Sequence, residues 1–101
     1  MTARKRLIVA PLALRDLSEM RDFIAQSSPR DAEALLADLT RKIAWIAEVD
    51  FTGSPRDHIL PGLRGLPYRQ RCIYYRSLPD RIVILRVLHG AQDVLAMKFE
   101  G

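Results

Sequence analysis

The sequence predicts an α+β fold in which an N-terminal strand and an α-hairpin pack on one face of a small, mainly antiparallel sheet, in the order β-α-α-β-β-β. Three observations support it: a β-branched run near the start, two consecutive helical patterns, and two apolar runs separated by a turn. Helices that are grouped together, rather than alternating with strands, are typical of this class. The 101 residues, 49% of them hydrophobic, suffice for a single domain covering residues 1–101.

The first strand and the first helix are predicted from residues 6–26. The run from Arg6 to Ala10 contains the β-branched residues expected of a strand. Pro11 then suits the first turn of a helix, where its missing N–H removes no hydrogen bond. Apolar residues recur every three or four positions as far as about Gln26, and they are Ala13, Leu17, Met20 and Ile24.

A second helix begins after a short serine-proline link. Ser28 suits the N-cap, Pro29 the first helical position, and Asp31 the first turn, where a negative charge is favourable. The apolar stripe that follows consists of Ala32, Leu35, Leu36, Leu39, Ile43 and Ile46. Two amphipathic helices joined in this way form an α-hairpin, and the sheet must cover their stripes.

Trp45 lies off this stripe when the residues are projected at about 100° each. Two interpretations remain open. The indole packs against the loop that follows or against the first helix, as large aromatic residues usually do. Alternatively it anchors a partner chain, because tryptophan is enriched at binding hot spots.

The second half of the chain is predicted to be a loop followed by strands. Turn-forming residues fill 50–62, and Leu63 to Leu66 suits a short strand. Two apolar runs, residues 72–75 and 82–88, then form a β-hairpin around the turn at residues 77–80. The tail from Val94 to Phe99 suits an edge strand or a helical turn.

The hairpin has one face predicted to be core and one predicted to be open. If Pro79 and Asp80 are the loop residues, Leu78 faces Arg81 and the side chains alternate from there. The predicted core face carries Cys72, Tyr74, Val83, Leu85 and Val87. The predicted open face carries Arg71, Ile73, Tyr75, Ile82, Ile84, Arg86 and Leu88. A shift of one residue would exchange the two faces.

The charge of the chain is concentrated beside this hairpin. The net charge is +4, and residues 1–50 contribute eight basic and eight acidic side chains, whereas residues 51–101 contribute eight and four. Of the 16 cations 13 are arginine, which suits two-pronged contacts with carboxylate or phosphate. The partner is therefore expected to be acidic, either a nucleic acid or an acidic protein segment.

Several classes of protein are not expected. The single Cys72 excludes an intramolecular disulfide framework and fits a reducing compartment, and one cysteine with two histidines makes a zinc site improbable. The apolar run near the start ends at Pro11, which is too short for a signal peptide, and no stretch is long enough to cross a bilayer. We expect a cytoplasmic protein without a cofactor or metal.

The order of elements and motifs resembles the RelE/ParE superfamily of toxins from bacterial type II toxin–antitoxin systems. The resemblance extends from Val9 to Asp93, and its most specific part is Arg-Val-Leu-His-Gly at residues 86–90 with Gln92-Asp93. The other matching pieces are Leu63-Arg64 and Ile73-Tyr74-Tyr75-Arg76. The resemblance implies the RelE/ParE-like fold described above.

The resemblance implies one of two activities. RelE-like members cut messenger RNA on the ribosome, using lysine and arginine on the open sheet face with a terminal tyrosine or histidine. ParE-like members share the fold without that catalytic set and poison DNA gyrase, which is a protein target. Both kinds are neutralised by a cognate antitoxin whose C-terminal segment wraps the toxin.

The residues that a nuclease of this family would need are incomplete here. Arg71 matches the arginine that these nucleases carry on the sheet, and Arg64 is a second candidate catalytic cation. His89 lies near the end of the last long strand, where a structural hydrogen bond is an alternative role for it. The segment before Arg64 has no lysine, Ala91 stands where members often have arginine, and residues 94–99 contain no tyrosine. We therefore expect a ParE-like gyrase inhibitor rather than an enzyme, with a RelE-like mRNA interferase as the alternative.

The expected partners are a cognate ParD-like antitoxin, in a hetero-oligomer, and DNA gyrase as the target. The predicted contact residues are Arg64, Arg69, Arg71, Ile73, Tyr75, Ile82, Ile84, Arg86 and Trp45. Arg71, Arg76 and Arg86 could also be ordinary solvated strand residues. Arg86, however, interrupts an apolar strand, where a charge needs a carboxylate or an open face. Direct nucleic-acid binding is not expected, although a general basic nucleic-acid-binding domain remains a third hypothesis.

Overall fold

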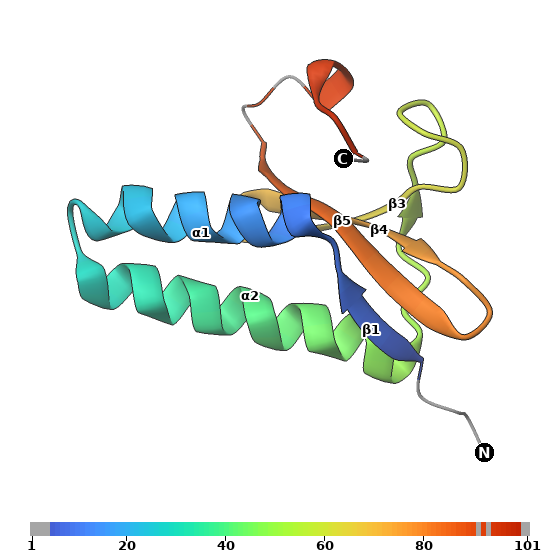
Figure 1. Ribbon diagram of the computed structural model, residues 1–101, viewed down its shortest axis with the longest axis horizontal. Coiled ribbons are helices and arrows are strands. Elements are labelled where there is room, and N and C mark those ends of the chain that lie inside the picture. The colour runs from blue at the N-terminus through green and yellow to red at the C-terminus, as the bar shows by residue number, and fades with distance from the viewer. Residues whose placement is uncertain (1–4, 91, 93, 100–101) are drawn as a thin grey trace.

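A computed structural model describes residues 5–90, 92 and 94–99. Two long helices pack against a five-stranded sheet of order β1-β5-β4-β3-β2 (Figure 1). In chain order the elements are β1 (Arg6–Val9), α1 (Pro11–Ala25), α2 (Pro29–Val49), β2 (Ser54–Pro55), β3 (Arg64–Tyr68), β4 (Arg71–Ser77), β5 (Arg81–His89) and the 3-10 turn η1 (Val94–Ala96). The predicted α+β class is confirmed. Ala91 and Asp93, which belong to the predicted motif, lie outside the described residues.

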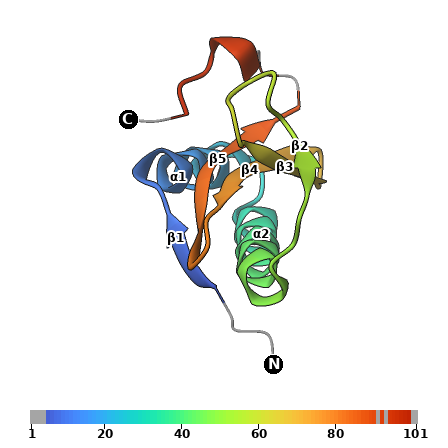
Figure 2. The same ribbon diagram turned by 90° about the vertical axis from the view of Figure 1, so that its right-hand side faces the viewer.

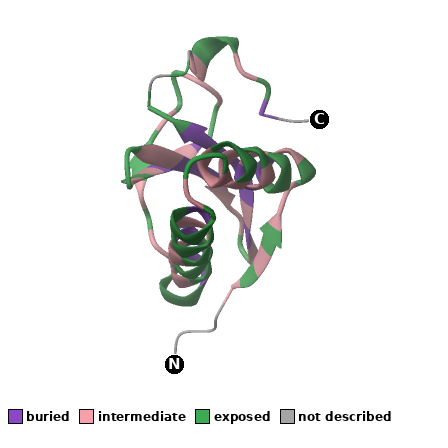
Figure 3. Ribbon diagram, turned by 90° about the vertical axis from the view of Figure 1, so that its left-hand side faces the viewer, coloured by how far each residue is buried: buried purple, intermediate pink, exposed green. Residues whose placement is uncertain are grey.

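The α-hairpin forms where the sequence predicts it. Pro11 and Pro29 occupy the first turns of α1 and α2, and the Ser28 hydroxyl accepts a hydrogen bond from the Asp31 amide at 3.2 Å. The C-cap residue Asp50 adopts a left-handed conformation with φ 50°. Buried residues of the predicted stripes are Ala13 and Leu17 in α1, and Ala32, Leu39, Ile43 and Ile46 in α2. Figure 3 shows both helices end-on, with their outer sides exposed.

The sheet is mainly antiparallel, with one parallel pair. β1 runs parallel to β5 and forms one edge, while β5, β4, β3 and β2 pair antiparallel in turn. The parallel pair arises because the α-hairpin and three further strands separate β1 from β5 in the chain. β2, which comprises two residues, lies within the segment predicted to be a loop.

The β4–β5 hairpin has the predicted turn but contains an unpredicted bulge. The Leu78 amide donates to the Arg81 carbonyl at 2.8 Å, as expected for a two-residue loop. Further along, Tyr75 pairs with Ile84, whereas the preceding Tyr74 pairs with Arg86. The residue between them, Leu85, is therefore an additional residue that reverses the faces of everything after it on β5.

The face of the sheet that packs against the helices is opposite to the one predicted. Four residues predicted to be open are 0% exposed beneath the α-hairpin: Ile73, Tyr75, Ile82 and Ile84. Alternation separates the two faces of a strand but does not determine which face the helices will cover, and here they cover the bulkier one. Because these side chains are fully buried, they cannot form the predicted contact surface for a partner.

Most of the residues predicted to be core belong to a second, smaller core on the reverse face, which we define as the side of the sheet away from the α-hairpin. This core contains Tyr74 and Leu85, and Cys72 and Val83 pack beside it. Val87 alone joins the helix-facing core, because the bulge at Leu85 turns it to that side.

The reverse face is covered by the chain itself. Phe99 is 7% exposed and meets the Tyr74 ring edge-on, with centroids 5.2 Å apart. Leu63, from the loop between β2 and β3, is 1% exposed in the same cluster. That loop and the C-terminal segment lie together on the side away from α2 (Figures 1 and 2). The expectation of a reverse face left open for a partner is therefore wrong over most of its area.

Among the described residues, neither helix combines the length and apolar character needed to span a bilayer.

Candidate functional site

Two predicted site residues, Arg71 and His89, meet at one end of the sheet. Tyr68, Arg71 and His89 lie side by side on β3, β4 and β5 in the strand register. The turn before Arg71 consists of Arg69 and Gln70, both with positive φ, 53° and 63°. Two-residue hairpin turns of this type favour asparagine and glycine, so these side chains strain the backbone by about 1 kcal/mol each.

Asp38 of α2 holds this end of the sheet against the helices. The Tyr68 hydroxyl donates to Asp38 Oδ1 at 2.8 Å, and Arg69 Nε donates to Asp38 Oδ2 at 2.7 Å. The Tyr68 hydrogen bond, together with Arg69, lowers the pKa of Asp38 below its usual value. Arg69, which was predicted to contact a partner, is therefore partly engaged within the chain, although 59% of its side chain stays exposed.

Arg71 differs from Arg69 in that no described residue pairs an acidic side chain with it. Its guanidinium donates to the Arg69 carbonyl at 3.3 Å, and among the described residues no carboxylate lies within ion-pair distance of it. Burial lowers the pKa of Arg71. A half-buried cation without a counter-ion favours an incoming anion, because burial has already removed part of its hydration.

A groove separates α1 from the end of the sheet and has a volume of about 590 Å³. We call it the helix–sheet groove; its lining residues are Asp16, Glu19, Met20, Phe23, Ile24, Arg71, Val87, His89 and Gln92. The Phe23 side chain, 72% exposed, stands at this groove. The α-hairpin extends well beyond the sheet here (Figure 1), which leaves this part of α1 without a strand beneath it.

A second concavity lies around the β3–β4 turn and has a volume of about 470 Å³. We call it the reverse-face hollow; its lining residues are Arg56, Pro67, Tyr68, Arg69, Gln70, Arg71, Cys72, Tyr74 and Gly90. Arg56 crosses Gly65, where a Cβ would lie 3.0 Å from Arg56 Nε and 3.1 Å from Cys72 Sγ. Glycine at position 65 therefore allows the guanidinium to lie against the sheet.

The thiol and the phenol in the hollow are protonated at neutral pH. Burial raises the pKa of Cys72, and burial likewise raises the pKa of Tyr74 to about 12. Neither group is poised to act as a nucleophile or a base. The hollow therefore offers guanidinium groups and an apolar surface rather than acid–base chemistry.

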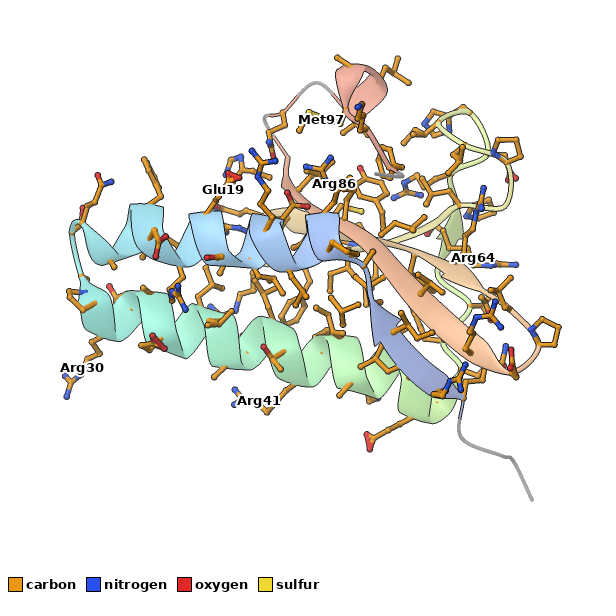
Figure 4. The ribbon with its side chains drawn as sticks, in the orientation of Figure 1. Glu19, Arg30, Arg41, Arg64, Arg86 and Met97 are labelled. Atoms are coloured by element: carbon orange, nitrogen blue, oxygen red, sulfur yellow. The ribbon has the colours of Figure 1, made fainter. Side chains whose placement is uncertain are left out.

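Arg86 does not belong to an open surface, contrary to prediction. It reaches Asp16 of α1 through two hydrogen bonds of 2.7 Å and also donates to the carbonyl of Lys98. Both side chains of the ion pair are 10% exposed. Figure 4 shows Arg86 between Glu19 of α1 and Met97 of the C-terminal segment. The carboxylate required for a charge in this strand comes from the chain itself.

The three candidate nuclease residues do not converge. Arg71 and His89 are neighbours, but Arg64 pairs with Tyr75 at the other end of β4, about 13 Å away at about 3.3 Å per residue. Arg64 donates to the Thr52 carbonyl at 3.0 Å, so it fastens the loop that follows α2. Arg64 and Arg71 therefore lie too far apart to stabilise together the negatively charged phosphorane that forms when RNA is cleaved.

Trp45 packs against the loop that follows its helix, which is the first of the two roles considered for it. Its ring lies 4.9 Å from that of Phe51, and Lys42 Nζ lies 4.0 Å from its centroid. The indole is half-buried beside the main core.

Phe23 and Arg56 are two residues of these concavities that were not predicted as site residues. Phe23 is an apolar residue of α1 that lies off the predicted stripe, and that offset is a signal the sequence does contain. Arg56 lies in a segment of turn formers, and only the tertiary structure brings it to Cys72. Among the described residues, no three acidic, histidine or cysteine side chains are grouped so as to hold a metal ion.

Comparison with known proteins agrees with this fold. A chain in the solved structure of the chromosomal ParDE TA system from P. aeruginosa superposes with a TM-score of 0.73 at 22% identity, covering 85% of this chain and 96% of that chain. Such a likeness demonstrates the fold. No curated protein sequence shows significant similarity. The family model for the ParE toxin of the type II toxin–antitoxin system, parDE, matches residues 7–94, and the chain therefore belongs to the ParE toxin family.

Proposed function

We propose that this toxin acts by binding and inhibiting DNA gyrase, and that a cognate ParD-like antitoxin neutralises it in a hetero-oligomer. Membership of the ParE family carries the proposal. It is supported by the wide separation of Arg64 from Arg71, which leaves the RNA-cleaving alternative without a compact set of cations. Cytoplasmic location is part of the proposal and is in keeping with the free thiol of Cys72.

The helix–sheet groove is the surface that we assign to the antitoxin. An amphipathic acidic segment would place apolar side chains against Phe23 and Met20 and a carboxylate beside Arg71. Docking of this kind would cover the exposed Phe23 ring and supply the counter-ion that Arg71 lacks among the described residues. Arg71 is the predicted contact residue that lies in this proposed antitoxin interface.

A supercoiling assay tests the proposed activity. Purified chain is added to gyrase, relaxed plasmid and ATP, and we expect the yield of supercoiled plasmid to fall as toxin concentration rises. Preincubation with a ParD-like antitoxin should restore supercoiling. An unchanged yield at large molar excess of correctly folded toxin would rule out this target.

The RelE-like alternative is tested in parallel. Message translated by purified ribosomes is incubated with the chain and analysed for cleavage by primer extension. We expect intact message. Cleavage that Arg71→Ala abolishes would replace the proposal with an mRNA interferase.

The antitoxin assignment has its own test. Wild-type and Phe23→Ala toxin are each titrated with antitoxin in a calorimeter, with Leu14→Ala as the matched control because Leu14 is also exposed on α1, at 55%, but does not line the groove. We expect Phe23→Ala to weaken binding by about tenfold or more, as for an interface anchor. Equal effects of the two substitutions would remove the groove from the antitoxin interface.

A further inference from the structure

We propose that the reverse-face hollow binds an extended acidic segment of the toxin's target protein. This inference deepens the proposed function, on which it rests for the identity of the protein that carries the segment. It concerns a surface distinct from the helix–sheet groove, although Arg71 lines both concavities.

The charge of the hollow is the first support. Three arginines line it, Arg56, Arg69 and Arg71, and no acidic side chain among the described residues does. Of these three arginines, Arg69 is the one whose guanidinium pairs with Asp38. Within the described part of the chain, Arg56 donates to the Pro55 carbonyl at 3.1 Å and forms no ion pair. Two guanidinium groups are thus held on a concave surface without a counter-ion in the described part of the chain, which is the arrangement that bidentate carboxylate binding uses.

The position of Arg56 is fixed by its backbone. Its amide donates to the Leu63 carbonyl at 2.8 Å, and its carbonyl accepts from the amides of Ile59 and Leu60 at 2.9 and 3.2 Å. The side chain then lies across Gly65 beside Cys72 Sγ. An anchored residue whose guanidinium rests on the sheet loses less conformational entropy on binding than a free surface arginine.

The aromatic residues of the hollow favour a peptide over a nucleic acid. Single-stranded nucleic acids bind largely by stacking their bases on exposed rings. Tyr74 is only 5% exposed and has Phe99 against its ring. Tyr68 donates its hydroxyl to Asp38, and Lys42 Nζ lies 5.3 Å from its ring centroid. With both tyrosines occupied, the described residues of the hollow provide cations but no stacking platform.

The apolar part of the hollow suits the aliphatic parts of the acidic side chains that an extended segment directs toward it. Pro67, Cys72 and Tyr74 line it between the arginines. A strand-like peptide directs successive side chains to opposite sides, so carboxylates at every second position would meet the arginines repeatedly. An extended segment with regularly spaced acidic residues is the occupant that matches this surface.

Fluorescence anisotropy with a defined probe tests the inference. The probe is a fluorescein-labelled peptide of alternating glutamate and leucine, and the comparison probes are the same peptide with glutamine for glutamate and a single-stranded oligouridylate. We expect wild-type toxin to bind the glutamate peptide and to bind the other two at least about tenfold more weakly. Tighter binding of the oligouridylate would overturn the proposal in favour of a nucleic-acid surface.

Two double variants test whether peptide binding depends on the arginines of the hollow or only on the total positive charge of the toxin. Arg56→Gln/Arg71→Gln should weaken peptide binding by about tenfold or more, because each charged hydrogen bond contributes substantially. Arg30→Gln/Arg41→Gln makes the same charge change on α2, where both side chains point away from the sheet (Figure 4), and should change it less than about twofold. Equal losses in the two double variants, or no peptide binding by wild type, would overturn the assignment.

Amide chemical shifts of wild-type toxin provide a test that does not depend on the variants folding. Adding the glutamate peptide should shift the amides of Gln70, Cys72 and Gly90 while leaving Phe23 unchanged. Shifts confined to the helix–sheet groove, or displacement of the probe by antitoxin, would contradict the assignment. Because this measurement needs no gyrase, failure of the supercoiling assay would refute the proposed target without deciding whether the hollow binds acidic peptides.

Discussion

Arg86 and Asp16 form a two-pronged ion pair that joins the last long strand to the first helix. Arg86 Nε and Nη2 each lie 2.7 Å from an Asp16 oxygen, and the Val87 amide donates to Asp16 Oδ2 at 2.9 Å. The hydrogen bonds from Arg86 to Asp16 raise the pKa of Arg86, so the guanidinium remains charged although it is buried. A third contact, to the carbonyl of Lys98, ties the C-terminal segment to the same guanidinium.

We expect Asp16→Ala to destabilise the fold by about 3–5 kcal/mol, because it leaves the Arg86 charge buried and unpaired. Urea denaturation followed by circular dichroism measures the change. Asp22→Ala is the matched control: it removes the partner of Arg21 from an exposed ion pair on the same helix and should cost less than about 0.5 kcal/mol. Similar losses in the two variants would contradict a special role for the buried pair.

Gly53 and Tyr75 provide a second stability test. Tyr75 is 0% exposed, its hydroxyl donates to the Phe51 carbonyl at 2.8 Å, and burial raises the pKa of Tyr75 to about 12. A Cβ on Gly53 would lie 2.3 Å from that hydroxyl, and φ is +66°. Gly53→Ala should therefore disrupt this hydrogen bond as well as strain the backbone.

The control is Gly62→Ala, where φ is +79° but nothing lies within 4 Å of the place that the new methyl group would take, so only backbone strain of about 1 kcal/mol is expected. We expect Gly53→Ala to cost at least about 1 kcal/mol more, measured by urea denaturation. In a Tyr75→Phe background this excess should shrink, because the clashing oxygen is gone. An excess that persists unchanged would point to another cause.

Acid should weaken the attachment of the β3–β4 turn to α2. The pKa of Asp38 is lower in the folded chain than the usual value of about 3.9, so its contribution to stability is complete above that pH and is lost as the pH falls through the folded pKa. We expect the difference in unfolding free energy between wild type and Asp38→Asn to be constant from neutrality to about pH 5 and to shrink below about pH 4. A difference that grows on acidification would have the wrong sign.

The C-terminal segment should stabilise the fold through the packed aromatic ring of Phe99. Phe99→Ala removes a side chain that is 7% exposed and packed on Tyr74, and should cost about 3 kcal/mol in thermal or urea denaturation. Leu95→Ala, at a position 74% exposed, should cost less than about 0.5 kcal/mol. Equal stability of the two variants would mean that this segment does not seal the reverse face in solution.

Local chemistry explains which elements were predictable. Pro11, Pro29 and Ser28 fix the helix starts through their own backbone geometry, and the turn around Pro79 and Asp80 fixes the start of the hairpin. These signals act within a few residues, so they can be recognised without the rest of the fold. The order of motifs also sufficed to indicate the ParE family, which the family model confirms.

The candidate site was harder to predict because it depends on contacts between distant segments. The bulge at Leu85 reverses the faces of the residues that follow it, and no local feature of the sequence marks it. Asp16 lies 70 residues before Arg86, so the sequence could show that this arginine needs a carboxylate but not which one. Arg56 reaches Cys72 only because its loop folds over the sheet.

The sequence by itself determined the α-hairpin, the β-hairpin and the family, because caps, turns and apolar periodicity are local properties of the chain. Only the tertiary structure decided which face of the sheet the helices cover, and that Phe99 and Leu63 close much of the other. The physical reason is that a strand with apolar residues on both sides can bury either one, and the choice depends on how distant segments share the available apolar surface.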